Sequence, residues 1–347
     1  MKSFLKTVLC FAALMGLATQ ADAQGNEPVS FAGKRVNVLI GFSAIGIGYD
    51  TYGRILARYL GRHLPGNPSV VPQNRPGAGS MNLANYLYNV APRNGTEIAL
   101  IGRGVAADPI ISGGTSTAKF DATKFTWLGS MNNEVAGFFL QDTAPAKTLE
   151  QILAGQPITV GSTGVGGDPY MFAATANTIL GTKLKMIAGY PGINEILLGM
   201  EKGELDGLLG YSWGTARVGS ASQLRDGKLK IILQLALQRH KELPQVPLIV
   251  DLVKNEQDRK ILELIFSRQS MGRPIAAPPG LEPRVAAALR QGFAETLRDP
   301  EFMAEASKLG LETSFVNGED VQKLVDSLYL IPKDVIDRAQ KIVTPEK

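Results

Sequence analysis

Short, mostly apolar runs alternate along the chain with stretches that repeat their apolar residues at helical spacing. The first run, 36–42, is typical of a strand buried on both faces in a parallel sheet. The stretch after it places apolar residues three and four positions apart between Tyr52 and Leu64, which predicts an amphipathic helix. Further strands are predicted from Ser69, at 97–102, from Phe125, from Ile158, at 184–190, at 205–210 and at 229–236, and further helices near 83–88, at 193–200, from about 283 to 297 and from Glu319. This alternation predicts an α/β protein with parallel sheets.

Two changes in composition break the alternation. A polar stretch rich in Gly, Ser and Thr precedes Phe125, which indicates a crossing into a second domain. After His240 the connections become rich in proline. With 347 residues, of which 44 % are hydrophobic, the chain is long enough for one or two domains with cores of their own.

The first residues have the pattern of a signal peptide. Lys2 and Lys6 give a basic start, an apolar stretch follows at 8–17, and Ala21-Asp22-Ala23 has the small-x-small form of a cleavage site. We therefore expect cleavage near Ala23, which removes residues 1–23 on export. The single cysteine, Cys10, lies in this segment, so the mature chain is expected to have neither disulfides nor thiol chemistry.

Charge and composition exclude several classes of partner. The formal net charge is +4, and loss of the signal peptide leaves 34 basic and 31 acidic residues, or +3. Because there is no long basic run, nucleic acid is not an expected partner. The chain has two histidines and no mature cysteine, so we expect no metal site.

Two glycine-rich loops share one design. "LIGFSAIGIGYD" at 39–50 and "ITVGSTGVGGDP" at 158–169 each run from a strand through almost bare backbone into a helix. We expect Asp50 and Asp168 to cap these helices, with Pro169 at the first helical position, and Gly181 to close the second helix.

Together the loops indicate a cleft that grips an anion from two sides. A helix N-terminus carries unpaired N–H groups and is worth about 0.3–1 kcal/mol to a nearby anion. Glycine lets a carboxylate or phosphate reach those N–H groups. One such loop is weak evidence, but two in different domains favour an anion-binding cleft.

Two other stretches partly match known motifs. Gly46-Ile47-Gly48 is similar to the start of a dinucleotide fingerprint, but Thr51 stands at the third glycine, which argues against a nucleotide cofactor. Residues 210–214 spell G-x-S-x-G, followed by Asp226 and His240 in hydrolase order. A serine hydrolase that uses Ser212 is therefore the alternative function, although the residues after it are a poor helix and His240 is expected at the surface.

The chain resembles the periplasmic solute receptors of tripartite tricarboxylate transporters, also called Bug proteins. The similarity covers nearly the whole mature chain and follows the family's order. It rests on "LIGFSAIGIGYD", "QNRPGAGS", "APRNGTEIALIG", "GSTGVGGDP", "GYPGINEILLGMEKGELDGLL", "LPQVPLI" and "IAAPPGLEPRVAAALRQGFAETLRDPEF". Ser43 and Ala44 depart from the family, which usually has prolines there.

The resemblance implies a type II periplasmic-binding-protein fold. In that fold two α/β lobes with mostly parallel sheets close on a ligand in the cleft between them. It implies a discontinuous first lobe, 24–125 and 240–347, and a second lobe, 126–239. The implied function is a receptor, not an enzyme, which binds a small carboxylate, usually a di- or tricarboxylate, and delivers it to membrane subunits. We expect a monomer without a metal or an organic cofactor.

Carried over by position, the resemblance also implies the binding residues. They are Ser43, Ala44 and Gly46 in the first loop and Ser162, Thr163 and Gly164 in the second, with Asp50 and Asp168 as helix caps. Arg103 follows a strand end and, if it points into the cleft, could clamp a second carboxylate bidentately. Tyr211 and Trp213 could line the cleft as a platform, or could serve core packing or the hinge.

Overall fold

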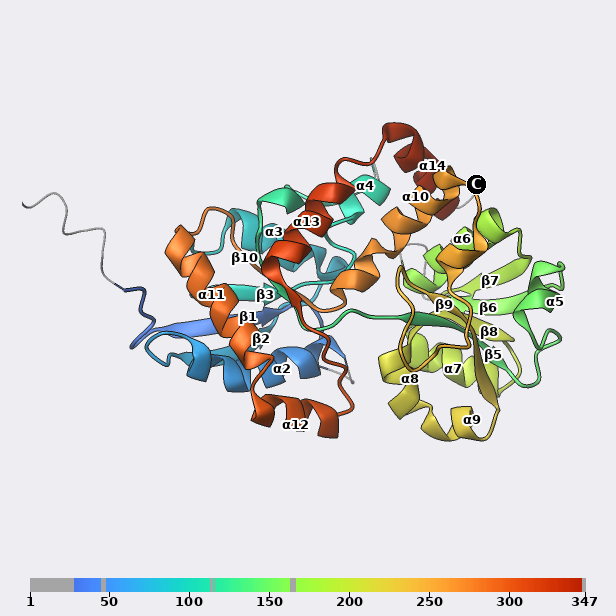
Figure 1. Cartoon of the computed structure of the whole chain (residues 1–347), viewed down its shortest axis with the longest axis horizontal. Coiled ribbons are helices and arrows are strands. Elements are labelled where there is room, and N and C mark those ends of the chain that lie inside the picture. Colours follow the sequence, from blue (N-terminus) through green and yellow to red (C-terminus); the bar gives the residue numbers. More distant parts are fainter. Residues whose placement is uncertain (1–27, 45–47, 113, 115, 163–166, 345–347) are drawn as a thin grey trace, which may run out of the picture.

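Two β-sheets organise the chain into two lobes that lie side by side (Figure 1). The computed structural model describes residues 28–44, 48–112, 114, 116–162 and 167–344. The expected signal peptide, 1–23, lies outside the described residues. We call the lobe that holds the first strand lobe 1 and the other lobe 2.

Six strands form the sheet of lobe 1, in the order β11-β4-β10-β3-β1-β2. They are β1 (Arg35–Ile40), β2 (Ser69–Asn74), β3 (Glu97–Leu100), β4 (Thr126–Ser130), β10 (Pro274–Ala277) and β11 (Val316–Asn317). The first three strands are parallel, as their strand–helix alternation predicts. β10 runs antiparallel between β3 and β4, because the chain returns to this sheet from the other lobe.

Five strands form the sheet of lobe 2, in the order β7-β6-β8-β5-β9. They are β5 (Ala136–Gln141), β6 (Ile158–Ser162), β7 (Leu184–Ala188), β8 (Gly207–Ser212) and β9 (Leu229–Leu235). β6 is parallel to β7 and β8, whereas β5 is antiparallel to both of its neighbours. The expected parallel pairing therefore holds for β6, β7 and β8. The sheet is mixed because β5, which enters from lobe 1, runs antiparallel to its neighbours.

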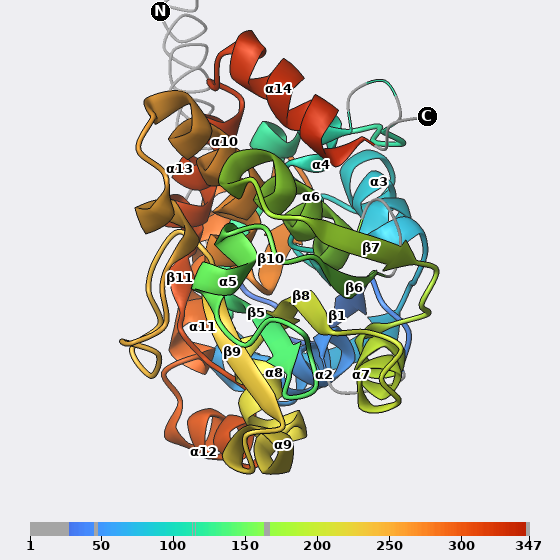
Figure 2. The same ribbon diagram turned by 90° about the vertical axis from the view of Figure 1, so that its right-hand side faces the viewer.

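Helices cover both sheets (Figures 1 and 2). On lobe 1 they are α2 (Tyr49–Leu60), α3 (Met81–Asn89), α11 (Pro283–Thr296), α12 (Pro300–Lys308) and α13 (Gly318–Leu328). On lobe 2 they are α5 (Leu149–Leu153), α6 (Asp168–Leu180), α7 (Ile193–Glu201), α8 (Trp213–Gly219) and α9 (Ala221–Arg225), and α10 (Glu256–Phe266) and α14 (Lys333–Val343) pack against α6. The short helix α4 (Asp108–Ile111) packs against α14 and joins the core of lobe 2.

The helix ends confirm one expected cap and correct two. Gly181 ends α6 in the left-handed conformation, φ 69°, which glycine adopts without a steric cost. Asp50 and Asp168 are not N-caps: the capping positions are Gly48 and Gly167, and neither aspartate accepts a capping hydrogen bond. Asp50 instead accepts hydrogen bonds from Asn74 Nδ2 and Arg54 Nε.

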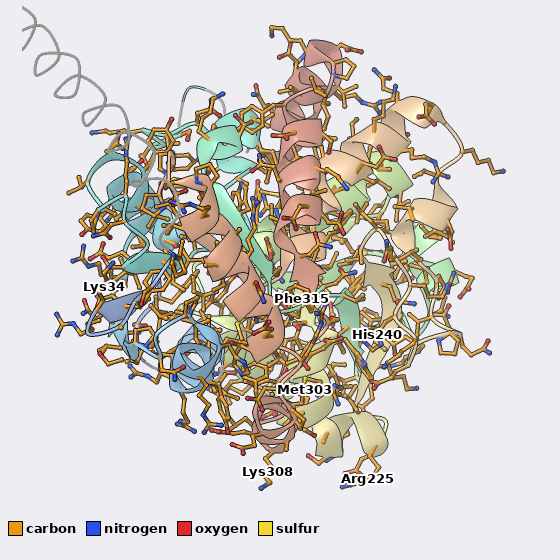
Figure 3. The ribbon with its side chains drawn as sticks, turned by 60° about the vertical axis from the view of Figure 1, so that its left-hand side comes forward. Lys34, Arg225, His240, Met303, Lys308 and Phe315 are labelled. Carbon is orange, nitrogen blue, oxygen red and sulfur yellow. The ribbon has the colours of Figure 1, made fainter. Side chains whose placement is uncertain are left out.

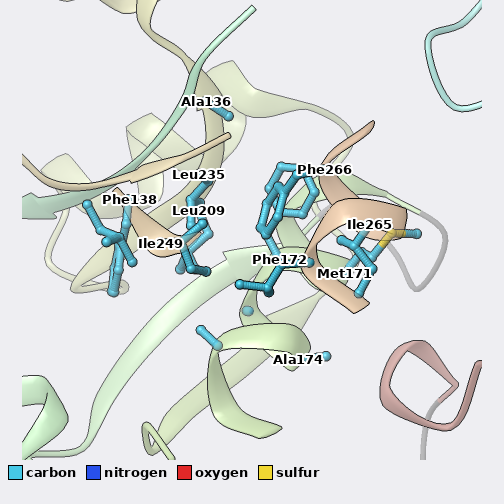
Figure 4. Close-up of a cluster of buried hydrophobic side chains, with 14 of the residues drawn as sticks. Ala136, Phe138, Met171, Phe172, Ala174, Leu209, Leu235, Ile249, Ile265 and Phe266 are labelled. Atoms are coloured by element: carbon cyan, nitrogen blue, oxygen red, sulfur yellow. The ribbon is translucent and has the colours of Figure 1, made fainter. Parts of the chain in front are cut away.

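The core of lobe 2 extends beyond its own sheet. Phe172 on α6 packs against Phe266 on α10, with ring centroids 4.7 Å apart, and both side chains are buried (Figure 4). Val335 and Ala339 of α14 belong to the same cluster. Burial of this apolar surface fixes α10 and α14 against α6.

The chain first crosses between the lobes at residues 131–135. β4 belongs to the sheet of lobe 1 and β5 to that of lobe 2, so the crossing lies after the expected boundary at 125/126. The expected first-lobe segment 240–347 includes α10 and α14, which pack on lobe 2. The exact division of the chain into lobes remains a prediction.

Among the helices in the described part of the chain, none has the length and the apolar content needed to span a bilayer.

Candidate functional site

A cleft of about 470 Å³ lies between the two lobes. Residues that follow strand ends or open helices line it from both sides. Lobe 1 and the crossing segments contribute Phe42, Tyr49, Gly79, Gly102, Arg103, Gly104, Glu134, Arg268 and Arg273, and lobe 2 contributes Gly167, Asp168, Gly192, Ile193, Asn194, Glu195, Gly210, Tyr211, Ser212 and Thr215. Among the described residues, the lining therefore includes three guanidinium groups and three carboxylates.

Arg103 joins the lobes at the floor of this cleft. Its Nε lies 3.0 Å from Asp168 Oδ2, its Nη2 contacts the same carboxylate, and its Nη1 pairs with Glu134. Only 14 % of its side chain is exposed. Arg103 thus points into the cleft, one of the two orientations considered, but protein carboxylates occupy its guanidinium. The bidentate clamp on a ligand carboxylate remains a prediction.

Asp168 is the acceptor shared by two arginines. Arg268 Nη1 lies 2.9 Å from its Oδ1, while Arg103 holds Oδ2. Burial would raise the pKa of Asp168, but the positive charges of Arg103 and Arg268 and their hydrogen bonds outweigh it and lower the pKa to about 2. Asp168 is therefore ionised throughout the neutral range and serves as an anchor between lobes.

Glu134 binds a second arginine in addition to Arg103. Its Oε2 lies 3.0 Å from Arg273 Nη1, and only 2 % of the Glu134 side chain is exposed. The Arg273 guanidinium carbon lies 4.4 Å from the ring centroid of Tyr49, which stacks on Phe42 at 4.0 Å. These contacts fix the orientation of Arg273 beside the cleft.

The structure brings together part of the expected set of binding residues. Arg103, Asp168 and Tyr211 line the cleft. Tyr211 is 5 % exposed, lines the cleft and packs on Phe139. Its role as a platform for a ligand remains a prediction.

The other expected residues lie elsewhere or outside the described residues. Ser43 and Ala44 are exposed, and Ser162 is buried at the end of β6. Trp213 donates from Nε1 to Glu242 at 2.8 Å and is not among the described residues that line the cleft. Gly46, Thr163 and Gly164 fall on residues outside those the structure describes.

Sequence reasoning missed Glu134, Arg268 and Arg273. Glu134 lies in the crossing between the lobes, and both arginines lie on the returning chain, far from either glycine-rich loop. No local motif marks these residues. A charged residue at a crossing between two domains is the one signal that could have selected Glu134.

The hydrolase alternative lacks its geometry. Ser212 has φ −64° and ψ 132°, an ordinary extended conformation rather than the strained turn of a nucleophile elbow. His240 is not a surface residue as expected: its side chain is 9 % exposed, and its Nε2 lies 2.9 Å from Glu312 Oε1. Asp226 pairs with its neighbour Arg225. The three residues therefore do not form a triad.

The guanidinium groups of the cleft suit an anion. Guanidinium groups donate planar pairs of hydrogen bonds that match carboxylates. Within the described ranges, His, Asp and Glu form no group of three that could hold a metal ion.

Known proteins support the same interpretation. The family described as "Tripartite tricarboxylate transporter family receptor" matches residues 54–340. The Cupriavidus necator protein called "UPF0065 protein in gbd 5'region" is 23 % identical over 334 residues, which cover 94 % of this chain and 93 % of that protein.

Solved structures have the same fold. A TctC solute binding protein from Polaromonas is 20 % identical with a TM-score of 0.67, and the match covers 89 % of this chain and 100 % of that one. An R. palustris protein solved with adipate is 16 % identical with a TM-score of 0.65, over 90 % and 98 % of the two chains. Because the family match covers residues 54–340, well over half of its length, the chain belongs to the tripartite tricarboxylate transporter receptor family.

Proposed function

We propose that the chain is a periplasmic solute receptor that captures a small organic anion between its lobes and delivers it to the membrane subunits of a tripartite tricarboxylate-type secondary transporter. The observation that carries the proposal is the interlobe cleft, to which Arg103, Arg268 and Arg273 bring three guanidinium groups. Membership of the receptor family and the adipate held by a relative support a carboxylate as the ligand. A di- or tricarboxylate is the form that the family resemblance implies.

Binding works by closure of the lobes on the ligand. Both lobes line the cleft, so a ligand that contacts both stabilises the arrangement in which they approach each other. The membrane subunits then recognise the loaded receptor. The protein acts as a monomer without a metal or an organic cofactor, and it catalyses no reaction.

Calorimetric titration of the purified protein tests the binding step. A panel of adipate, malate, citrate, benzoate and hexanoate should include an acid that binds at one site per chain. Asn194→Trp, an exposed position on α7 that lines the cleft, should weaken that binding at least tenfold. Leu198→Trp is the matched control on the same helix, because Leu198 is 48 % exposed and is not among the residues lining the cleft.

Two results would contradict the proposal. If no acid of the panel binds, the ligand is not a small carboxylate, and if both tryptophan variants weaken binding equally, the cleft is not the binding site.

Cell fractionation tests the location: the mature protein should appear in the periplasmic fraction and should be shortened near Ala23. Membranes that contain the transporter subunits should capture the ligand-loaded protein, and membranes without them should not. This comparison tests the delivery step.

A further inference from the structure

A second cavity adjoins the cleft. This cavity, which we call the chamber, has a volume of about 630 Å³. Gly79, Gly104, Gly167 and Arg268 line both the cleft and the chamber. Three of these four residues are glycines, so of the four only Arg268 has a side chain at the boundary between the cleft and the chamber.

The chamber differs from the cleft in chemistry. Its lining includes five apolar side chains that are 7 % exposed or less, namely Met81, Val105, Ile111, Met171 and Val343. The one carboxylate among its described lining residues, Asp108, accepts hydrogen bonds from Ser112 Oγ at 2.8 Å and Ser116 Oγ at 2.5 Å. An apolar lining with few polar groups suits a hydrocarbon portion of a ligand.

Arg268, at the boundary between the cleft and the chamber, has a hydrogen-bond donor that is not used. Its side chain is 7 % exposed, and its Nη1 binds Asp168 Oδ1. Its Nε has no hydrogen-bond partner among the described residues. Arg103, by contrast, is paired with two carboxylates. A guanidinium has five N–H donors, so a small shift of Arg268 opens donors for one ligand carboxylate.

The charges of the cleft leave little room for a second carboxylate. The positive charges of Arg103, Arg268 and Arg273 are matched by Glu134, Asp168 and Glu195. Glu195 stands in the first turn of α7, so a carboxylate of the chain already lies at this helix N-terminus. Arg268 can donate to one ligand carboxylate, but a second one would add a further negative charge that the lining does not balance, which disfavours its ionised form in a cleft.

We infer that the ligand is an amphipathic monocarboxylate, whose carboxylate binds at Arg268 and whose hydrocarbon part occupies the chamber. This inference rests on the proposed function and narrows its ligand class. The aliphatic part passes the three glycines, where the wall between cleft and chamber has no side chains.

Titration with acids of matched length tests the charge argument. Hexanoate should bind at least tenfold more tightly than adipate, and octanoate at least tenfold more tightly than suberate. Octanoate should exceed hexanoate by about tenfold, since two more methylenes are buried. Glu195→Gln should raise the affinity for adipate at least threefold, because it removes one negative charge from the lining of the cleft.

Variants of α14 test the chamber. Val343→Trp should fill it and weaken octanoate binding at least tenfold, whereas Lys341→Trp, exposed on the same helix and outside the lining, should not. Thr344→Trp, at an exposed lining position, gives the same test if Val343→Trp fails to fold.

The outcomes separate this inference from the function it narrows. Tight binding of adipate, citrate or another polycarboxylate with weak binding of the monoacids overturns the inference and leaves the receptor function standing. If Val343→Trp and Thr344→Trp both leave the octanoate affinity unchanged, the chamber does not hold the hydrocarbon part of the ligand. Failure of every acid to bind overturns the receptor function together with the inference.

Discussion

Arg103 and Asp168 meet across the interlobe cleft, with Arg103 Nε 3.0 Å from Asp168 Oδ2. Arg103 follows β3 in the sheet of lobe 1, whereas Asp168 opens α6 on lobe 2. A charge-assisted hydrogen bond between the lobes stabilises the arrangement in which they face each other closely. The chain's own side chains therefore hold the lobes together, in addition to any ligand.

Acid should weaken this connection. The pKa of Asp168 is lowered from its ordinary value of 3.8 to about 2, so its ionised form stabilises the folded state above pH 4 and that contribution is lost as the pH falls towards 2. The expected loss in the free energy of unfolding is about 1 kcal/mol at pH 3 and about 2 kcal/mol at pH 2. Urea unfolding at pH 5, 3 and 2 measures it.

Asp168→Asn is the control for that titration, because the amide has no charge to lose. The difference in unfolding free energy between the native chain and this variant should shrink by the same amounts as the pH falls. A difference that stays constant from pH 5 to pH 2 would show that the carboxylate of Asp168 is not stabilised in the folded state.

Loss of the charge on Glu134 should cost more than loss of an exposed carboxylate. Glu134→Gln leaves the buried guanidinium of Arg273 and one edge of Arg103 without their anion, and breaking a buried pair costs about 3–5 kcal/mol. Glu319→Gln, which alters an exposed pair with Arg290, should change stability by less than about 1 kcal/mol. Equal effects of the two variants in thermal or urea unfolding would contradict a structural role for the buried pair.

Local signals were enough to place much of the secondary structure. The apolar run from Ile158 becomes β6, the helix predicted at 193–200 becomes α7, and the proline at 283 opens α11. Each of these elements carries its own period or capping residue within a few positions. The same is true of Gly181, whose lack of a side chain allows the left-handed turn that ends α6.

The charged cluster in the cleft has no such local signal. Asp168 was predicted as a cap because an acid before a proline usually begins a helix, and α6 does begin there. Its carboxylate nevertheless turns to Arg103, 65 residues earlier, and to Arg268, 100 residues later. Two charged partners bind a carboxylate more strongly than a backbone N–H does, and only the folded chain brings them together.

His240 and Glu312 form another contact between the lobes. His240 follows β9 of lobe 2, and its Nε2 lies 2.9 Å from Oε1 of Glu312, which follows α12 of lobe 1. Both residues line a groove that also includes Met303, and Figure 3 labels His240 and Met303 on this face. The contact is nearly buried, since the two side chains are 9 % and 15 % exposed.

Glu312→Ala should therefore lower the free energy of unfolding by about 1–3 kcal/mol, because the ring nitrogen of His240 loses its partner in a buried position. It should also increase the radius of gyration measured by small-angle X-ray scattering, as the lobes separate. Glu301→Ala, which removes an exposed partner of Arg62, is the matched control and should change neither quantity. An unchanged radius of gyration in Glu312→Ala would assign this pair to local stability alone.

Removal of the charge on Asp168 should also change which anions bind. Its carboxylate occupies donors of Arg103 and Arg268 and faces any ligand anion in the cleft with a like charge. In Asp168→Asn one negative charge is gone and both arginines have donors available, so adipate should bind at least tenfold more tightly than to the native chain, although the variant is less stable. Calorimetric titration at pH 7 measures this change, and thermal unfolding shows that the variant is folded at the temperature used. Weaker binding of adipate to the folded variant would mean that Asp168 holds the two guanidinium groups in the geometry that the ligand needs, so that its positioning effect exceeds its repulsion of the anion.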